Sequence, residues 1–283
     1  MDYYGLEYDD FHEHSDIPFD LVEDYEALNQ KIARDIAERL KANNEANQDT
    51  TAILPVGPLD YTFLADICNE ERIDLRRLRV YMMDEYMNEE GEAISENHPL
   101  SFRRFMKETL VDNLDDELGL EMDQIIFPDP ANTDEISQEI LEMDGVEVCY
   151  GGFGITGHFA FNDPPEPDDT TTDLNDLRES RTRVLEITRE SVTQMVMGGS
   201  HGNWEIVPRQ AVTLGMKELL ASDEIHLTFM RSWHAGVLRR TLFGPVSVDC
   251  PGSLLQEHDQ VEVTLTEIAA EPPVLNVDQD IGE

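Results

Sequence analysis

The sequence predicts an α/β fold in which a mostly parallel sheet is covered by helices on both faces. Short apolar runs alternate with segments whose apolar residues recur every three or four positions, the pattern of strands alternating with amphipathic helices. With 283 residues, 40% of them hydrophobic, the chain has room for a sizeable core. We expect one Rossmann-like domain over residues 20–268, preceded by an N-terminal arm (1–19) and followed by an acidic C-terminal tail (269–283).

The first amphipathic helix is expected from Asp20 to near Asn43 and Asn44, with Asp20 and Glu23 as its capping box. Further strands are expected at residues 51–55, 78–83, 125–127, 146–150, 183–187, 207–214, 225–230 and 261–265. Further helices are expected at residues 61–68, 100–111, 134–143, 190–197 and 235–242, with a helical turn at 251–255. Residues 165–179 are acidic and lack apolar periodicity, which indicates a mobile surface loop able to act as a lid.

The charge balance is the most unusual bulk property. Asp and Glu number 61 and Lys and Arg 20, for a net charge of −41. Such a surface repels nucleic acid and anionic membranes, so neither is an expected partner. Because the acidic residues are spread over the whole chain, we interpret them as an adaptation to high salt, where a Debye length of about 3 Å at 1 M screens the self-repulsion.

The sequence offers few signs of targeting or of cofactors. No apolar run reaches the roughly 18 residues of a membrane helix, and the first residues are acidic where a signal peptide is basic; we expect a cytoplasmic protein. Cys68, Cys149 and Cys250 are far apart and odd in number, as expected of reduced core residues. The chain has neither a Walker A loop nor a GxGxxG fingerprint, so we expect no nucleotide cofactor, and no metal.

The glycine-rich segment GGFGITGHFAFNDP (151–164) follows a predicted buried strand. Its glycines permit a tight turn and a close approach to a ligand. His158 and Asp163 flank a short apolar patch, a layout suited to an imidazole held in place for proton transfer. The alternative is a glycine-rich turn with a structural histidine.

Other candidate groups also follow predicted strands directly. Asp84 and Glu85 come after one strand, Gly57 after another, and Arg231 and His234 after a third. In an open α/β sheet, ligands bind at the carboxyl ends of the strands, so these groups and His158 are expected to converge on one edge. In so acidic a chain, an acidic pair such as Asp84-Glu85 also arises by chance.

Several blocks together resemble the glucosamine-6-phosphate deaminase family, whose wider superfamily includes 6-phosphogluconolactonases. They occur in the family's order between about residues 20 and 265. The blocks are MDEY (83–86), HPLSFRRFM (98–106), GGFGITGHFAFNDP (151–164), SRTRVLEIT (180–188), VPRQAVTLGMKELLAS (207–222) and HAGVLRRTLFGP (234–245).

The resemblance implies an enzyme that opens an amino-sugar ring, moves a proton between C2 and C1, and releases ammonia to give a ketose phosphate. It implies that Asp84 is the base that moves the proton, supported by Glu85. His158 would assist ring opening, with Asp163 beside it in place of the family's glutamate. By the same resemblance Gly57, Gly154, Thr156, Gly157, Arg231 and His234 would contact a sugar or sugar phosphate, and the protein would self-associate as a homo-oligomer.

The chain departs from the family pattern at positions that bear on activity. Thr156 stands where the family's GxDGH has an aspartate, and a hydroxyl cannot stabilise an imidazolium as a charge does. The family's GGTP or GSTP phosphate loop reads Gly57-Pro58-Leu59-Asp60 here. His234 replaces a lysine, and an arginine expected after SRTR falls near Met197. We therefore expect an altered phosphate site, to which Arg231, Arg181 or Arg183 could supply a charge from a new position.

Three hypotheses follow from these departures. The first is an amino-sugar aldose–ketose isomerase or deaminase, favoured by Asp84, Glu85, His158 and Asp163. The second is a lactonase-like hydrolase, which needs His158 as a base for water. The third is a sugar-binding or regulatory protein that has lost catalysis.

Overall fold

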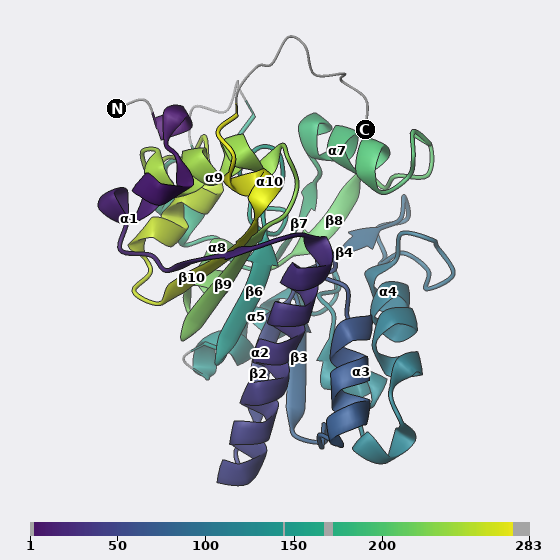
Figure 1. The fold of residues 1–283 in the computed structure, drawn as a ribbon. Helices are drawn as coiled ribbons and strands as arrows, with labels where there is room; N and C mark the ends of the chain where they lie inside the picture. The colour runs from purple at the N-terminus through teal and green to yellow at the C-terminus, as the bar shows by residue number, and fades with distance from the viewer. Residues whose placement is uncertain (1–2, 144, 167–171, 274–283) are drawn as a thin grey trace.

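A seven-stranded parallel sheet forms the centre of the computed structural model, which describes residues 3–143, 145–166 and 172–273 (Figure 1). The strand order is β1-β10-β9-β6-β2-β3-β5. The strands are β1 (Phe19–Val22), β10 (Val261–Thr266), β9 (Glu224–Phe229), β6 (Val148–Gly152), β2 (Thr50–Leu54), β3 (Leu78–Met82) and β5 (Ile125–Ile126). This confirms the predicted α/β class with a parallel sheet.

A second, three-stranded antiparallel sheet was not predicted. It consists of β4 (Asp84–Met87), β8 (Gln210–Thr213) and β7 (Arg183–Glu186), in the order β4-β8-β7. Strand β3 passes through Met83 directly into β4, and Asp84 pairs with Thr213 of β8. The predicted strand over 78–83 therefore ends where a second sheet begins, so Asp84 and Glu85 lie within a strand rather than in a loop.

Helices cover both faces of the large sheet. The helices are α1 (Phe11–His14), α2 (Tyr25–Ala46), α3 (Thr62–Glu71), α4 (Phe102–Thr109), α5 (Thr133–Glu142), α6 (Leu174–Arg178), α7 (Arg189–Gly198), α8 (Met216–Leu220), α9 (His234–Phe243) and α10 (Glu267–Ala270). Short 3-10 segments lie at Tyr3–Gly5, Tyr8–Asp10, Val111–Asn113, Asp116–Leu118, Met122–Gln124 and Pro251–Glu257.

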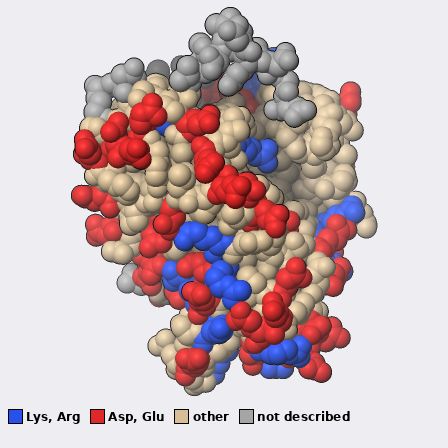
Figure 2. All heavy atoms as spheres, in the orientation of Figure 1, with Lys and Arg blue, Asp and Glu red and all other residues tan. Residues whose placement is uncertain are grey.

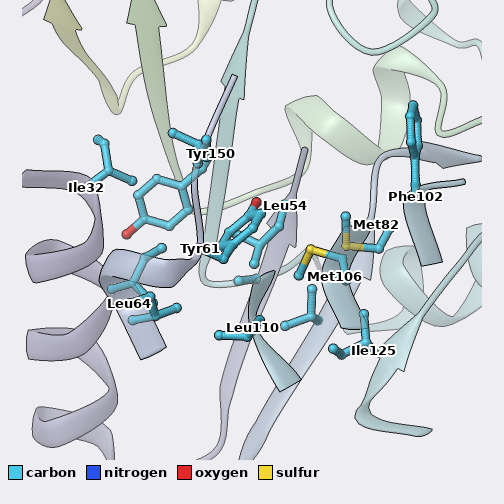
Figure 3. Packing of buried hydrophobic residues seen from close by; sticks show 14 of the residues in the cluster. Ile32, Leu54, Tyr61, Leu64, Met82, Phe102, Met106, Leu110, Ile125 and Tyr150 are labelled. Atoms are coloured by element: carbon cyan, nitrogen blue, oxygen red, sulfur yellow. The ribbon is translucent and has the colours of Figure 1, made fainter. Parts of the chain in front are cut away.

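Alternating side chains along the strands divide the core into two clusters. In β2, Leu54 packs with α2, α3 and α4, whereas its neighbour Ile53 packs with residues of α5, α8 and α9. Figure 3 shows part of the first cluster, including Leu54, Met82 and Tyr150 from the sheet. Successive residues of a strand point to opposite faces, so β2, β3 and β6 contribute to both clusters, whereas the apolar residues of β9 and β10 belong to the second cluster.

The predicted start of the first helix was wrong. Residues 19–22 form the edge strand β1, in which Asp20 pairs with Thr264 of β10. The helix begins at Tyr25, and the side chain of Asp24 caps it by accepting a hydrogen bond from the amide of Ala27 at 2.9 Å. A true N-cap residue thus lies four positions after the predicted one, because Phe19 is buried in the core and draws its neighbours into the sheet.

The segment expected to be an arm packs against the domain. Phe11 is fully buried, and Arg239 of α9 stacks over its ring. The Arg239 guanidinium donates to the carbonyls of Leu6, Ala235, Ala270 and Glu271 at 2.6–3.1 Å. This buried cation therefore joins the N-terminal segment to α10, which lies in the predicted tail. Residues 274–283 of that tail lie outside the described residues.

The predicted lid over 165–179 is only partly described. Residues 167–171 lie outside the described residues, and 174–178 form helix α6, which the side chain of Asp173 caps. Acidic side chains dominate the face drawn in Figure 2, with basic ones interspersed. Within the described ranges, no helix has the length and apolar character needed to cross a membrane.

Candidate active site

The glycine-rich segment runs from the carboxyl end of β6, at the middle of the large sheet. Gly154 makes room for the imidazole of His158, since a Cβ at position 154 would lie 2.0 Å from both Cε1 and Nε2 of that ring. Gly157 adopts a φ of +83°, and a Cβ there would lie 2.6 Å from the sulfur of Cys250. Both glycines, predicted to contact substrate, thus have steric reasons to lack a side chain.

His158 forms a buried pair with Asp163. The Nδ1 of His158 lies 2.7 Å from Oδ1 of Asp163, and the two side chains are 10% and 6% exposed. Hydroxyls of Thr156 and Ser191 lie 2.9 and 3.0 Å from the same Nδ1. The carboxylate accepts from both hydroxyls, at 2.7 Å from Thr156 and 2.8 Å from Ser191.

These contacts keep Asp163 ionised. Burial acts to raise its pKa, but the His158 imidazole and the hydroxyl donors of Thr156 and Ser191 outweigh burial and hold the pKa below its usual value. An ionised Asp163 favours the tautomer in which Nδ1 carries the proton, which leaves Nε2 to exchange protons with a ligand. The predicted pairing of His158 with Asp163 is therefore present in the structure.

Ser191 was missed by the sequence analysis. It lies in the first turn of α7 and is 1% exposed. It follows Asp163 by 28 residues, so no local spacing connects the two. A serine early in a helix that follows a strand was the only available signal.

Asp84 is a second buried carboxylate, on β4. It is 8% exposed, and burial, with the neighbouring charge of Glu85, raises its pKa to about 8. A carboxyl group with that pKa exchanges a proton readily near neutral pH, as a general acid or base must.

Glu85 anchors helix α4 to the same strand. Its carboxylate accepts hydrogen bonds from the amides of Tyr86, Phe102 and Arg103, each at 3.0 Å, and the last two belong to the first turn of α4. Burial raises the pKa of Glu85, although these amide bonds counteract it. Glu85 is fully buried, so its carboxylate supports the backbone around Asp84.

Backbone and ring contacts connect the His158 segment to the strand that carries Asp84. The amide of Phe161 donates to the hydroxyl of Thr213 at 3.1 Å, and Thr213 is the residue paired with Asp84. The ring of Phe161 lies 5.6 Å from that of Tyr86 and 6.3 Å from that of His158. The segment of His158 and the strand of Asp84 are thus joined by a hydrogen bond from Phe161 to Thr213.

Hydrogen bonds to Asp60 and packing of Pro58 define the loop after β2. The carboxylate of Asp60 accepts hydrogen bonds from the amide and hydroxyl of Thr62, at 3.0 and 2.7 Å, at the start of α3. Pro58 packs against Gly152, where a Cβ would lie 2.8 Å from its ring. Gly57 faces open space, with no atom within 4 Å of an added Cβ. Asp60 therefore occupies a helix N-terminus that could otherwise hold an anion.

His234 and Arg231 have different environments. His234 is 2% exposed; its Nδ1 accepts from the amides of Met230 and Arg231 at 2.8 and 3.2 Å, and its Nε2 lies 3.3 Å from the carbonyl of Phe153. Burial, and then the charge of Arg231, lower the pKa of His234 to about 3. Both ring nitrogens thus contact backbone groups of this chain. A neutral His234 cannot supply the positive charge that the family resemblance led us to expect from a lysine at this position.

Arg231 is exposed and makes no ion pair with any described residue. A Cβ on Gly198, at the end of α7, would lie 3.7 Å from its Nη1. The charge of Arg231 also affects Tyr25 at the start of α2. Burial and the charge of Asp60 raise the pKa of Tyr25, and Arg231 partly offsets that rise. The Arg231 guanidinium therefore lies among the ends of β9, α7 and the beginning of α2.

A cavity of about 310 Å³ lies on the Asp163 side of the site. Arg183 lines it together with Asp163, Asp176 and Ser180. Burial lowers the pKa of Arg183, and Glu218 counteracts the change. In the part of the chain that the structure describes, no three His, Cys, Asp or Glu side chains are arranged to hold a metal ion.

Comparison with solved structures places the fold in one class. The chain superposes on a monomeric glucosamine-6-phosphate deaminase with a TM-score of 0.75, at 22% identity, over 90% of this chain and 99% of the other. It superposes on a 6-phosphogluconolactonase from Shewanella baltica with a TM-score of 0.62, at 16% identity, over 89% and 99%. The fold is thus the one shared by these deaminases and lactonases.

Sequence comparison distinguishes between the two groups. The chain is 30% identical to a glucosamine-6-phosphate deaminase from Exiguobacterium sibiricum over 206 residues, which cover 71% of this chain and 73% of the relative. It is 28% identical to glucosamine-6-phosphate deaminase 2 from Bacillus subtilis, over 86% and 92%. A scan against protein-family models finds no match. The chain belongs to the glucosamine-6-phosphate deaminase family, a family of enzymes, as a divergent member.

Proposed function

We propose that this protein is an aldose–ketose isomerase and deaminase of an amino-sugar phosphate, with an altered phosphate site. One observation carries the proposal: a His158–Asp163 pair and a second buried carboxylate, Asp84, are joined through Phe161 and Thr213 at one edge of the sheet. Two separate acid/base groups suit a reaction that moves protons at two sites of one substrate.

Each group has a proposed role. Nε2 of His158 exchanges the proton that opens the sugar ring, while Asp163 holds the imidazole in the required tautomer. Ionised Asp84 removes the proton from C2 and delivers it to C1, which leaves an iminium at C2; a water molecule then adds to C2, and the amine leaves as ammonia to give the ketose. Because the pKa of free Asp84 is about 8, we expect kcat/KM to rise with pH up to about 8. A cationic substrate amine bound nearby would lower that pKa in the complex.

Arg231 is the proposed contact for the substrate's anionic group. It is exposed and unpaired among the described residues, and a Cβ on Gly198 at the end of α7 would lie 3.7 Å from its Nη1. Gly57 and Thr156 complete the proposed substrate contacts, and Gly154 and Gly157 act by shaping the loop. Arg183, beside the cavity at Asp163, is the alternative cation.

An assay of glucosamine 6-phosphate turnover, in which the release of ammonia and ketose phosphate is measured, tests the proposed reaction. Asp84→Asn is expected to lower kcat at least 100-fold while binding is retained, since the base is lost and the shape is kept. If the wild-type protein instead hydrolyses 6-phosphogluconolactone and releases no ammonia, the lactonase hypothesis replaces ours. If it binds the amino sugar but turns over neither compound, it is a binding protein.

The proposed anion contact has a separate test. Arg231→Ala is expected to raise KM for the phosphorylated sugar about tenfold or more and to leave kcat within about threefold, because one charge-assisted contact is lost. Arg183→Ala tests the alternative cation: a larger rise in KM there than in Arg231→Ala would assign the anion contact to Arg183. Equal KM for glucosamine and its 6-phosphate would show that no phosphate contact exists.

Assembly, location and salt dependence are further proposals. We propose that the protein works in the cytoplasm at high salt, which its net charge of −41 supports, and that it forms a homo-oligomer, unlike the monomeric deaminase on which it superposes. Sedimentation velocity at low and high KCl measures the assembly. A single monomeric species at every KCl concentration would contradict it.

A further inference from the structure

We propose that Ser191 is a positioning residue that works jointly with Thr156 to hold Asp163, the one carboxylate beside the imidazole among the described residues, and through it His158. This inference rests on the proposed function for its kinetic consequences. Its structural part, that the two hydroxyls fix the orientation and tautomer of His158, stands independently.

The hydrogen atoms at this cluster can be assigned one by one. Nδ1–H of His158 has Asp163 Oδ1 at 2.7 Å. The Thr156 hydroxyl donates to the same oxygen, and the Ser191 hydroxyl has Oδ1 at 2.9 Å and Oδ2 at 2.8 Å. An ionised carboxylate has about four lone-pair sites, so it can accept all three donors. Ser191 is the donor that reaches both oxygens, and it therefore restrains rotation of the carboxylate.

Helix α7 fixes the position of Ser191. The amide of Ser191 donates to the hydroxyl of the N-cap residue Thr188 at 3.3 Å. One turn later, Oε1 of Gln194 accepts from the amide of Ile155 at 2.7 Å, inside the His158 loop. Two contacts thus join α7 to this loop, and the positive end of the helix lies on the side of the carboxylate.

The hydroxyls also account for how the site operates without a second carboxylate. Thr156 contributes no charge, so the pKa of Asp163 is held low by His158 and two hydroxyl donors. Loss of either donor would raise the pKa of Asp163 and let the carboxylate turn away from Nδ1. Misplacement of a reacting group by about 1 Å can cost roughly 100-fold in rate.

Ser191→Ala tests the proposal, with Ser137→Ala as the control. Ser137 is likewise a buried serine on a helix, 2% exposed, on α5 away from the site. We expect Ser191→Ala to lower kcat roughly 10-fold to 100-fold and to leave KM within about threefold. Restoring a hydroxyl with Ser191→Thr should recover at least part of kcat. The control should behave as wild type.

Nitrogen NMR of the imidazole provides a readout that needs no substrate. In the wild type we expect His158 to carry its proton on Nδ1, and in Ser191→Ala we expect a mixture of the two neutral tautomers. The double variant, Ser191→Ala with Thr156→Val, should lower kcat by a smaller factor than the product of the two single reductions, because both hydroxyls act on one carboxylate. An unchanged tautomer in Ser191→Ala overturns the inference whether or not the protein deaminates, whereas a changed tautomer in an inactive protein supports it and refutes only the proposed function.

Discussion

The burial of Asp84 predicts a variant that gains stability as it loses activity. Folding moves the pKa of this carboxyl group from 3.8 to about 8. Between those two values the unfolded chain is ionised at this position while the native protein keeps the proton. Stability contributed by the protonated group is therefore present at low pH and lost as pH rises toward 8.

The size of the effect follows from the same pKa. The Asp84→Asn variant carries no charge at this position at any pH, so it escapes the cost of ionising a buried group. Its free energy of unfolding should exceed the wild-type value by an amount that grows about 1.4 kcal/mol per pH unit, or about 3 kcal/mol between pH 5 and pH 7. For a chain of this size, that corresponds to a Tm difference that widens by roughly 6 °C.

Urea unfolding of both proteins at pH 5, 6 and 7 measures this difference. Asp123→Asn provides the control, because Asp123 is an exposed aspartate whose replacement should give a difference independent of pH. The same Asp84→Asn protein should show no deaminase turnover. A stability difference between Asp84→Asn and wild type that stays constant across these pH values would refute the reasoning about buried Asp84.

Further predictions concern other elements of the structure. Gly154→Ala should lower kcat at least 100-fold, because the new methyl would displace the His158 ring; wild-type kcat would contradict the geometry. Arg239→Met should lower the free energy of unfolding by about 3 kcal/mol or more in urea, since it leaves four carbonyls without their donor; a change under 1 kcal/mol would contradict the role of this clamp. Glu85→Gln should cost about 2 kcal/mol, because one amide oxygen cannot replace a carboxylate at the start of α4; a neutral effect would show that the cap is dispensable. Added KCl should raise Tm as it screens the net charge of −41; an unmoved melting curve would remove the high-salt hypothesis.

The sequence predicted those parts of the fold in which a local pattern decides the structure. Strands such as Thr50–Leu54 and helices such as α3 and α9 were found within a few residues because apolar periodicity and burial agree there. Strand β1 was missed because Asp20 and Glu23 imitate a helix start, and only pairing with β10 makes the segment a strand. The small sheet was missed because β4 is wholly buried and has no polar alternation.

The residues of the candidate site also divide into those that a local sequence pattern predicts and those that only the tertiary fold brings together. His158 and Asp163 are five residues apart, so local sequence was enough to pair them. Ser191 reaches the site only through the placement of α7, which no local pattern encodes. His234 illustrates the reverse problem: alignment with a lysine suggested a ligand contact, but the imidazole accepts hydrogen bonds from amides at the end of β9.

The most direct test of the central claim is proton NMR of glucosamine 6-phosphate incubated with the wild-type protein and with Asp84→Asn. We predict that the wild type removes the hydrogen at C2 and converts the aldose to a ketose phosphate and ammonia, while Asp84→Asn does neither. A C2 hydrogen that persists with the wild-type protein, at substrate concentrations where binding is demonstrated, would contradict the proposed role of Asp84 and His158.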